Sequence, residues 1–297
     1  MSSTERISRK KIVIAGAGQF GRSAATLLNT QEYELIAFAD NNPKVQNTNL
    51  TLPTGQTLPV LSVPDAILLK PDTIMTGVID ETRTEELCRQ LRSSGFSGEM
   101  LTLRSDYLHL DIRSATLIRL AARIRSLQIP GAVAELGVYR GDLAVKLNAL
   151  FPERTLYLFD TFEGFDLRDV EEELKRNLSR ASTSEFEDTS IELVRSRLVH
   201  PEKAFFRKGF FPDTAEGLEN ERYCLVSLDA DLYAPILAGL RYFWPRLNKG
   251  GMILLHDYGN ERFRGARRAV NEFEQEVGFL PLVPLCDLHG TAVIIKT

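Results

Sequence analysis

The stretch AVAELGVYRGDLAVKLNAL, residues 132–150, decides the fold of this chain. A short, mainly apolar run leads into a turn marked by glycines, and a helical pattern follows the turn. The stretch KIVIAGAGQFGRSAATLL, residues 11–28, has the same plan near the amino terminus. Because strands that alternate with helices in this way form parallel sheets, the sequence predicts an α/β fold with two similar domains.

The composition is that of a globular protein. At about 150 residues per domain, the length of 297 residues suggests two domains. Hydrophobic residues make up 43% and charged residues 26%, which excludes a disordered chain. A net charge of −4 argues against a nucleic-acid-binding protein, and no stretch approaches the roughly 18 consecutive apolar residues of a membrane helix. Three scattered cysteines without metal spacing favour a reduced, cytoplasmic protein.

The pattern along the chain also predicts the domain boundary. Strands and helices alternate up to about residue 105 and then stop. An amphipathic helix follows over roughly 111–127, with arginines on its polar side, and Pro130-Gly131 ends it. We therefore expect an amino-terminal domain, a connecting helix and a second domain, at residues 1–105, 106–130 and 131–297.

The second domain is predicted to end in a β-hairpin. The apolar runs LPLVPL and TAVIIKT flank a turn at Asp287-Leu-His-Gly. Five strand–helix units precede this hairpin, so its last strand should run antiparallel to the rest of the sheet. Before it, we expect a helix from Pro235 to Leu247 that Lys249-Gly250-Gly251 closes as a glycine cap.

Polar residues follow four strands of the second domain. Glu135, Asp160 and Asp229 each stand at the end of a strand, and His256-Asp257 stands at the end of another. Ligands of open α/β sheets bind at the carboxyl ends of the strands, so we expect these side chains to meet in one crevice. Asp231 is expected instead to start the following helix.

Glycines mark the same crevice. Glu135, Gly137 and Gly141 form an E-x-G-x-x-x-G pattern, whose glycines let the backbone turn tightly beside a ligand. Asp160 is placed to bind both hydroxyls of a ribose, as an acidic residue does in dinucleotide folds. Together with the terminal hairpin, these features resemble the class I S-adenosylmethionine-dependent methyltransferases, whose sheet is Rossmann-like.

Five blocks of sequence narrow this resemblance to the macrocin O-methyltransferase family, over roughly residues 110–297. That family includes enzymes that methylate sugar hydroxyls in macrolide and aminocoumarin biosynthesis. The resemblance implies S-adenosylmethionine as the methyl donor and a sugar-like small molecule as the acceptor. The blocks, in order, are VAELGVYRGDLAVKL, LYLFDTFEGF, EDTSIELVRSRL, SLDADLYAPILAGL and GGMILLHDYGNERFRGARRAVNEF.

The resemblance also implies a divalent cation, usually magnesium, that holds a sugar diol beside the methyl donor. The metal-binding positions of the family match Asp229, His256 and Asp257. Family members commonly have two aspartates where this chain has His256-Asp257, and imidazole suits transition metals better than magnesium. Manganese, or a site without metal, is therefore an alternative to magnesium. Asp229 or His256 would accept the proton of the hydroxyl as general base.

Two flanking segments complete the expected site. The charged segment 166–190 is longer than a normal strand–helix loop and fits a substrate lid. Lys208-Gly209 ends the third strand, where such folds usually meet the adenine. The predicted cofactor site thus consists of Glu135, Gly137, Gly141, Asp160 and Gly209.

The amino-terminal domain carries a dinucleotide fingerprint. Gly16, Gly18 and Gly21 follow a strand and open a helix, and Asp40 stands 19 residues beyond Gly21, at a ribose-binding position that favours NAD. The domain also resembles small nucleotide-binding-like domains attached to sugar-modifying enzymes, whose pocket holds a nucleotide sugar or nothing known. An NAD site, a nucleotide-sugar site and a structural relic therefore all stay open.

The leading hypothesis is a metal-assisted O-methyltransferase that acts on a sugar or another polyhydroxylated small molecule, with the first domain positioning the substrate. One alternative is an NAD-dependent oxidoreductase built on the glycine motif at 16–21. A second is a non-catalytic nucleotide-binding regulatory protein with a degenerate methyltransferase fold. No nucleic-acid or membrane partner is expected, and a homo-oligomer is compatible with the sequence.

Overall fold

The computed structural model describes residues 9–52, 54–109 and 111–297. The chain forms two compact units, the first ending at Asp111 and the second beginning at Ile112. Each unit is built around its own sheet. Two helices occupy the segment that was expected to connect the domains: α4 (Leu103–His109) belongs to the first unit and α5 (Ile112–Ser126) to the second.

A six-stranded sheet forms the first unit, in the order β3-β4-β2-β1-β5-β6. Its neighbouring strands are parallel except for the pair β3 and β4. The sequence analysis missed this hairpin, because both strands are short and β3 is mainly polar. The strands are β1 (Lys10–Ala15), β2 (Tyr33–Ala39), β3 (Thr48–Thr51), β4 (Thr57–Leu61), β5 (Thr73–Thr76) and β6 (Glu99–Thr102); the other helices are α1 (Gln19–Leu27), α2 (Val63–Leu68) and α3 (Glu81–Ser93).

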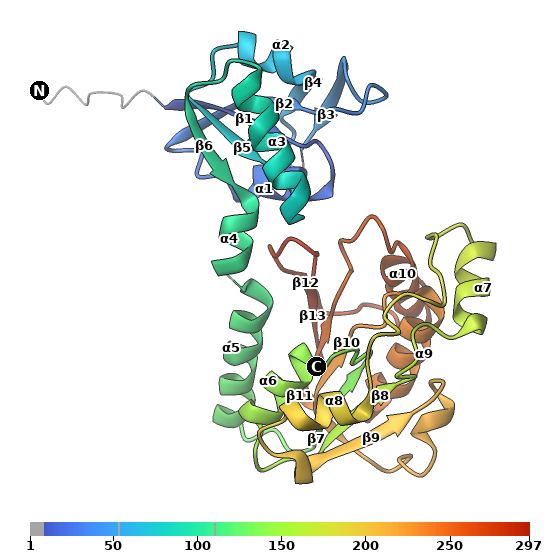
Figure 1. Cartoon of the computed structure of the whole chain (residues 1–297). Coiled ribbons are helices and arrows are strands. Elements are labelled where there is room, and N and C mark those ends of the chain that lie inside the picture. Colours follow the sequence, from blue (N-terminus) through green and yellow to red (C-terminus); the bar gives the residue numbers. More distant parts are fainter. Residues whose placement is uncertain (1–8, 53, 110) are drawn as a thin grey trace, which may run out of the picture. The chain divides into compact units, whose positions relative to one another are not determined.

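The second unit contains a seven-stranded sheet in the order β12-β13-β11-β10-β7-β8-β9 (Figure 1). Five neighbouring strands, β11, β10, β7, β8 and β9, are parallel to one another. Strand β13 is antiparallel to both of its neighbours. The predicted α/β fold with a terminal antiparallel hairpin is confirmed. The strands are β7 (Ala132–Leu136), β8 (Leu156–Asp160), β9 (Ala204–Lys208), β10 (Tyr223–Leu228), β11 (Leu247–Leu255), β12 (Leu282–Pro284) and β13 (Ala292–Ile295).

The strand order of the second sheet reverses at β7. Strands β8 and β9 lie on one side of β7, and β10 and β11 lie on the other. Such a reversal opens a crevice at the carboxyl ends of the two central strands, where α/β sheets bind their ligands. The topology therefore places the ends of β7, β8, β10 and β11 around one crevice.

Helices cover both faces of the second sheet. Helices α9 and α10 pack on one face, around Leu240 and Phe273. Helices α5, α6 and α8 pack on the other, and α5 contributes Leu117, Ala121 and Ile124 to this core. Among the described residues, no helix has the length and apolar character needed to cross a membrane. The helices are α6 (Asp142–Leu150), α7 (Leu167–Lys175), α8 (Ile191–Arg197), α9 (Tyr233–Phe243) and α10 (Gly265–Val277).

The helix expected at Pro235–Leu247 ends earlier, and the glycine pair after it is not a cap. Helix α9 ends at Phe243, shortly before Pro245, whose ring cannot continue an α-helix. Strand β11 then begins at Leu247 and runs through both glycines. The Gly250 N–H donates to the carbonyl oxygen of Lys296 at 2.7 Å, so the pair extends the sheet beside the last strand.

Candidate functional site

The carboxylate of Asp160, at the end of β8, holds the glycine turn that follows β7. Its Oδ2 accepts hydrogen bonds from the backbone N–H groups of Val138 and Tyr139, at 2.6 and 2.9 Å. Its Oδ1 accepts another from the N–H of Phe162, at 2.6 Å. These donors use most of the roughly four acceptor positions of a carboxylate. A bound ribose would therefore hydrogen-bond to Asp160 alongside these backbone N–H groups.

The predicted cofactor glycines are required by the backbone itself. Gly137 has a φ of 85°, and a Cβ there would lie 2.1 Å from the carbonyl oxygen of Asp229. Gly141 has a φ of 81°, and its Cβ would lie 2.8 Å from a side chain of α8. Gly209 has a φ of 132°, and its N–H donates to the carbonyl oxygen of Asp160 at 2.9 Å. The turns after β7 and β9 thus meet the ends of β10 and β8.

Glu135 lies beneath this turn, next to the end of β7. Its side chain is 1% exposed, and its Oε2 has no hydrogen-bond partner among the described residues. Burial raises the pKa of Glu135 well above its usual range, although the nearby Arg113 opposes the shift. A buried polar atom without a partner costs free energy and is a natural contact for a ligand.

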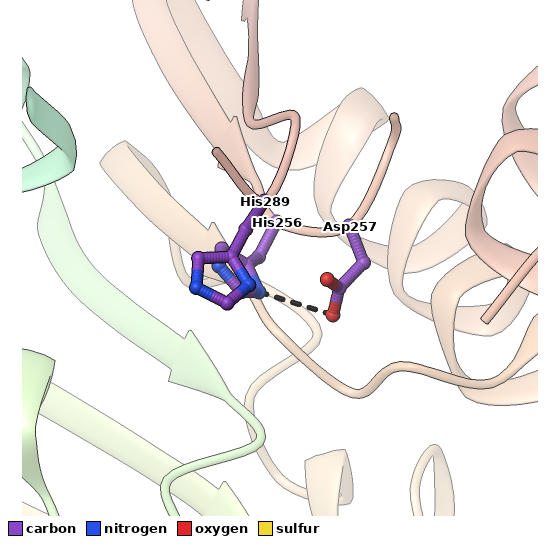
Figure 2. A group of neighbouring side chains, drawn as sticks. All are labelled: His256, Asp257 and His289. Carbon is purple, nitrogen blue, oxygen red and sulfur yellow. Dashed lines mark ion pairs between the residues drawn. The ribbon is translucent and has the colours of Figure 1, made fainter. Parts of the chain in front are cut away.

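Opposite charges alternate across the ends of β10 and β11. Nη1 of Arg113, on α5, donates to Oδ2 of Asp229 at 2.9 Å. The other oxygen of Asp229 lies 2.9 Å from Nδ1 of His256. The same nitrogen lies 3.0 Å from Oδ2 of Asp257, as Figure 2 shows. The three residues predicted to bind a metal therefore meet, and Arg113 joins them.

Burial disfavours the charged form of each of these side chains, but attraction to the neighbouring opposite charges is stronger. Arg113 and His256 hold the pKa of Asp229 well below its usual range. Asp229 and Asp257 together raise the pKa of His256 to about 10. The imidazolium of His256 also keeps the pKa of Asp257 low. At neutral pH these four groups therefore form two carboxylates and two cations.

Asp231 belongs to this site, and its assignment to the start of a helix was wrong. Helix α9 begins only at Tyr233, with Leu232 as its N-cap. One carboxylate oxygen each of Asp229, Asp231 and Asp257 lie within 4.8 Å of one another. Burial, together with the charge of Asp257, raises the pKa of Asp231 well above its usual range. The D-x-D spacing at the end of a strand was the signal that could have revealed it.

Two further residues of the site left no signal in the sequence. Arg113 was placed on the arginine side of the helix at 111–127, yet it reaches Asp229, 116 positions away. His289 lies in the turn of the terminal hairpin, and its ring centroid is 5.3 Å from that of His256. Burial lowers the pKa of His289, which favours a neutral imidazole. Only the folded chain brings these residues together.

Comparison with known proteins identifies the family. The profile of the family described as Macrocin-O-methyltransferase (TylF) matches residues 111–296. This chain belongs to the macrocin-O-methyltransferase family. The match covers the second unit almost completely and confirms the resemblance seen in the sequence.

Two curated relatives of this family member are named as O-methyltransferases, and the name of the first includes a rhamnosyl group. The chain is 27% identical over 179 residues to 8-demethyl-8-(2,3-dimethoxy-alpha-L-rhamnosyl)-tetracenomycin-C 4'-O-methyltransferase of Streptomyces olivaceus, covering 56% of this chain and 65% of the relative. It is 26% identical over 174 residues to mycinamicin III 3''-O-methyltransferase of Micromonospora griseorubida, covering 54% and 67%. The chain thus spans about two thirds of the length of these relatives.

Solved structures of two methyltransferases share the fold of this family member. The O-methyltransferase NovP aligns with a TM-score of 0.51 at 21% identity, over 62% of this chain and 79% of NovP. The calicheamicin methyltransferase CalS11 aligns with a TM-score of 0.50 at 21% identity, over 72% of this chain and 92% of CalS11. These alignments confirm the class I methyltransferase fold.

The segment predicted as a lid is attached to the glycine turn in this macrocin-O-methyltransferase family member. The hydroxyl of Tyr139 donates to Asp188 at 2.5 Å, and the hydroxyl of Thr189 donates to the carbonyl oxygen of Tyr139. The rings of Tyr139 and Phe186 pack edge to face, with their centroids 5.1 Å apart. The end of this segment, at Phe186, Asp188 and Thr189, therefore lies beside the glycine turn, and the role of residues 166–190 as a lid stays a prediction.

The glycine motif of the first unit folds as its pattern predicts. The N–H of Ala17 donates to Oδ2 of Asp40 at 2.8 Å, and the other oxygen of Asp40 accepts from the following loop. A Cβ on Gly21 would lie 1.8 Å from the carbonyl oxygen of Gly16, so this contact requires glycine. At Gly18, no described atom lies within 4 Å of a Cβ position. The family match leaves this unit out, and its ligand stays a prediction.

Proposed function

We propose that this chain transfers a methyl group from S-adenosylmethionine to a hydroxyl of a sugar or of another polyhydroxylated small molecule. Membership of the macrocin-O-methyltransferase family supports the reaction, and the rhamnosyl group in the name of one relative supports a sugar-like acceptor. The observation that carries the proposal is the meeting of the glycine turn with the charged cluster of Asp229, His256 and Asp257 at one end of the sheet.

The cofactor site consists of the turn after β7 and the ends of β8 and β9. The unpartnered Oε2 of Glu135 and the carboxylate of Asp160 offer acceptors to a ligand with hydroxyl or amino donors. Gly137, Gly141 and Gly209 hold the turns that border this space. When bound, S-adenosylmethionine supplies an electrophilic methyl group on its sulfonium.

The residues around Asp257 fit a divalent cation. Asp229, Asp231 and Asp257 can each offer one oxygen within 4.8 Å of the others, which suits a hard cation. We propose that Asp229, His256 and Asp257 contribute to a magnesium or manganese site, as the sequence predicts. Such a cation would lower the pKa of the acceptor hydroxyl and orient it.

Asp231 is the carboxylate best suited to accept the proton of the acceptor hydroxyl. Asp229 is a weak base because Arg113 and His256 stabilise its charge. His256 already holds a proton between two carboxylates. The pKa of Asp231 is raised, so Asp231 can accept this proton only after it has lost its own; the ionised carboxylate would then be the strongest base of the three aspartates. Asp229 and His256, predicted as catalytic, would then position the reacting groups.

The test measures binding and turnover separately. In a calorimetric titration with S-adenosylhomocysteine, Asp160→Ala should weaken binding about tenfold or more, because it loses a charged acceptor. Asp229→Asn should retain this binding, which shows that it folds, and should lower kcat about 100-fold with a sugar acceptor. Asp213→Asn is the control, since Asp213 is an exposed carboxylate at the surface. Full activity of Asp229→Asn would refute the site.

For the first unit we propose a nucleotide site at Gly16, Gly18, Gly21 and Asp40. The turn with Gly16, Gly18 and Gly21 opens helix α1, and the amino-terminal end of a helix favours a phosphate. Titration with NAD and with a nucleotide sugar tests the proposal, and Asp40→Ala should abolish the binding. Binding of NAD without any binding of S-adenosylhomocysteine would favour the oxidoreductase instead. The cytoplasmic location stays a prediction.

A further inference from the structure

Two imidazoles and a carboxylate gather at one edge of the charged cluster. His256 and Asp257 directly follow β11, and His289 comes from the turn between β12 and β13 (Figure 2). One ligand atom of each lies within 4.8 Å of those of the other two. The two imidazole rings are tilted by 33° with their centroids 5.3 Å apart. This donor set differs from the three carboxylates on the other side of Asp257.

The hairpin turn that carries His289 is fixed against the loop after Asp257. The N–H of Gly259 donates to the carbonyl oxygen of Gly290 at 2.8 Å. A Cβ on Gly290 would lie 2.4 Å from the Cα of Gly259, so the two loops touch at a position that only glycine allows. Asp287 closes the turn by accepting hydrogen bonds from the N–H and the hydroxyl of Thr291, at 2.7 and 2.8 Å. His289 is therefore held in place by rigid backbone.

The surroundings of His256 match those of a histidine that binds a metal. Its Nδ1 faces the carboxylate of Asp229 at 2.9 Å, and Arg113 holds that carboxylate from the other side. Histidines that ligate metals commonly donate one ring N–H to a carboxylate and bind the ion through the other nitrogen, from which the ion displaces the second proton of His256. The guanidinium of Arg113 lies against Asp229 and repels a cation there. The charge of Arg113 also acts on His256, but the carboxylates of Asp229 and Asp257 act on the same ring with the opposite sign and outweigh it.

We propose that His289 is a further protein ligand beside His256 and Asp257, so that the cation site of the proposed function takes a divalent first-row transition ion rather than magnesium. Two imidazole nitrogens and one carboxylate suit manganese, iron, cobalt or zinc, whereas magnesium prefers oxygen ligands only. Three protein ligands leave coordination positions open, which two neighbouring hydroxyls of a sugar can occupy. The use of the ion in methyl transfer rests on the proposed function, but the ion site itself does not.

The experiment titrates Co²⁺ into the full-length chain after treatment with a chelator, without methyl donor or acceptor. Visible absorption reports nitrogen ligands, and calorimetry gives the stoichiometry. We expect one Co²⁺ per chain, and a large excess of Mg²⁺ should not displace it. His289→Gln should weaken binding about tenfold or more. His289→Asp, which restores an oxygen ligand, should shift the preference towards Mg²⁺. His200→Gln is the control, because His200 lies outside the cluster and pairs with Glu202.

Three results would overturn the ion site: no binding of Co²⁺, displacement by Mg²⁺ at equal concentration, or unchanged affinity in His289→Gln. Binding of S-adenosylhomocysteine by each variant shows that it is folded. Methyl transfer is assayed separately. An ion site without methyl transfer would refute the proposed function alone, and methyl transfer without an ion site would refute this inference alone.

Discussion

His256 stands at a position where the resemblance to the family leads us to expect an aspartate. Its ring stands between two carboxylates, Asp229 and Asp257, at 2.9 and 3.0 Å. Because these contacts raise its pKa from 6.5 to about 10, folding favours the protonated ring. The stabilisation is complete below the unfolded pKa and is lost as the pH rises through the folded one.

Replacing His256 should therefore flatten the pH dependence of stability. With a chelator present, the melting temperature of the wild type should fall between pH 6.5 and about 10 more steeply than that of His256→Gln. Glu135 and Asp231, whose pKa values are raised, also make stability fall as the pH rises, but they do so in the wild type and in His256→Gln alike. His200→Gln should follow the wild-type curve. Parallel curves for the wild type and His256→Gln would show that His256 is not charged in the folded protein.

At the scale of the element, the turn after β7 is positioned by contact with the end of β10. A Cβ at residue 137 would lie 2.1 Å from the carbonyl oxygen of Asp229. Gly137→Ala should therefore lower the free energy of unfolding by about 3 kcal/mol or more and weaken binding of S-adenosylhomocysteine. Gly217→Ala is the matched control, because its φ is 82° and no described atom lies within 4 Å of its Cβ position. It should cost only about 1 kcal/mol.

Denaturant unfolding measures both glycine variants. Equal losses at the two positions would mean that the positive φ alone requires Gly137, and that its contact with β10 contributes nothing.

Elements were predictable where the signal is local. The strand, glycine turn and helix at 132–150 lie within one stretch, so hydrophobic period and turn residues suffice to predict them. The convergence of Glu135, Asp160 and Asp229 followed from the rule that parallel strands end at one edge. Arg113 and His289 were not predictable, because helix packing and the final hairpin place them.

At the scale of the whole molecule, the family match covers only the second of two compact units. The carboxylates Asp40 and Asp160 have similar places in the two units. Asp40 accepts one backbone N–H, and Asp160 accepts two, from the glycine turn after the preceding strand. If each unit binds its own ligand, Asp40→Ala should leave the affinity for S-adenosylhomocysteine within about twofold of wild type. A larger change in the calorimetric titration would show that the units are coupled.

The place of β13 has a consequence for the solubility of the second unit. Strand β13 lies between β11 and β12, so it covers the edge that β11 would otherwise leave unpaired. An unpaired strand edge is a template for pairing with another chain and invites aggregation. Substitutions that weaken the pairing of β13 with β11 should therefore promote aggregation of the second unit.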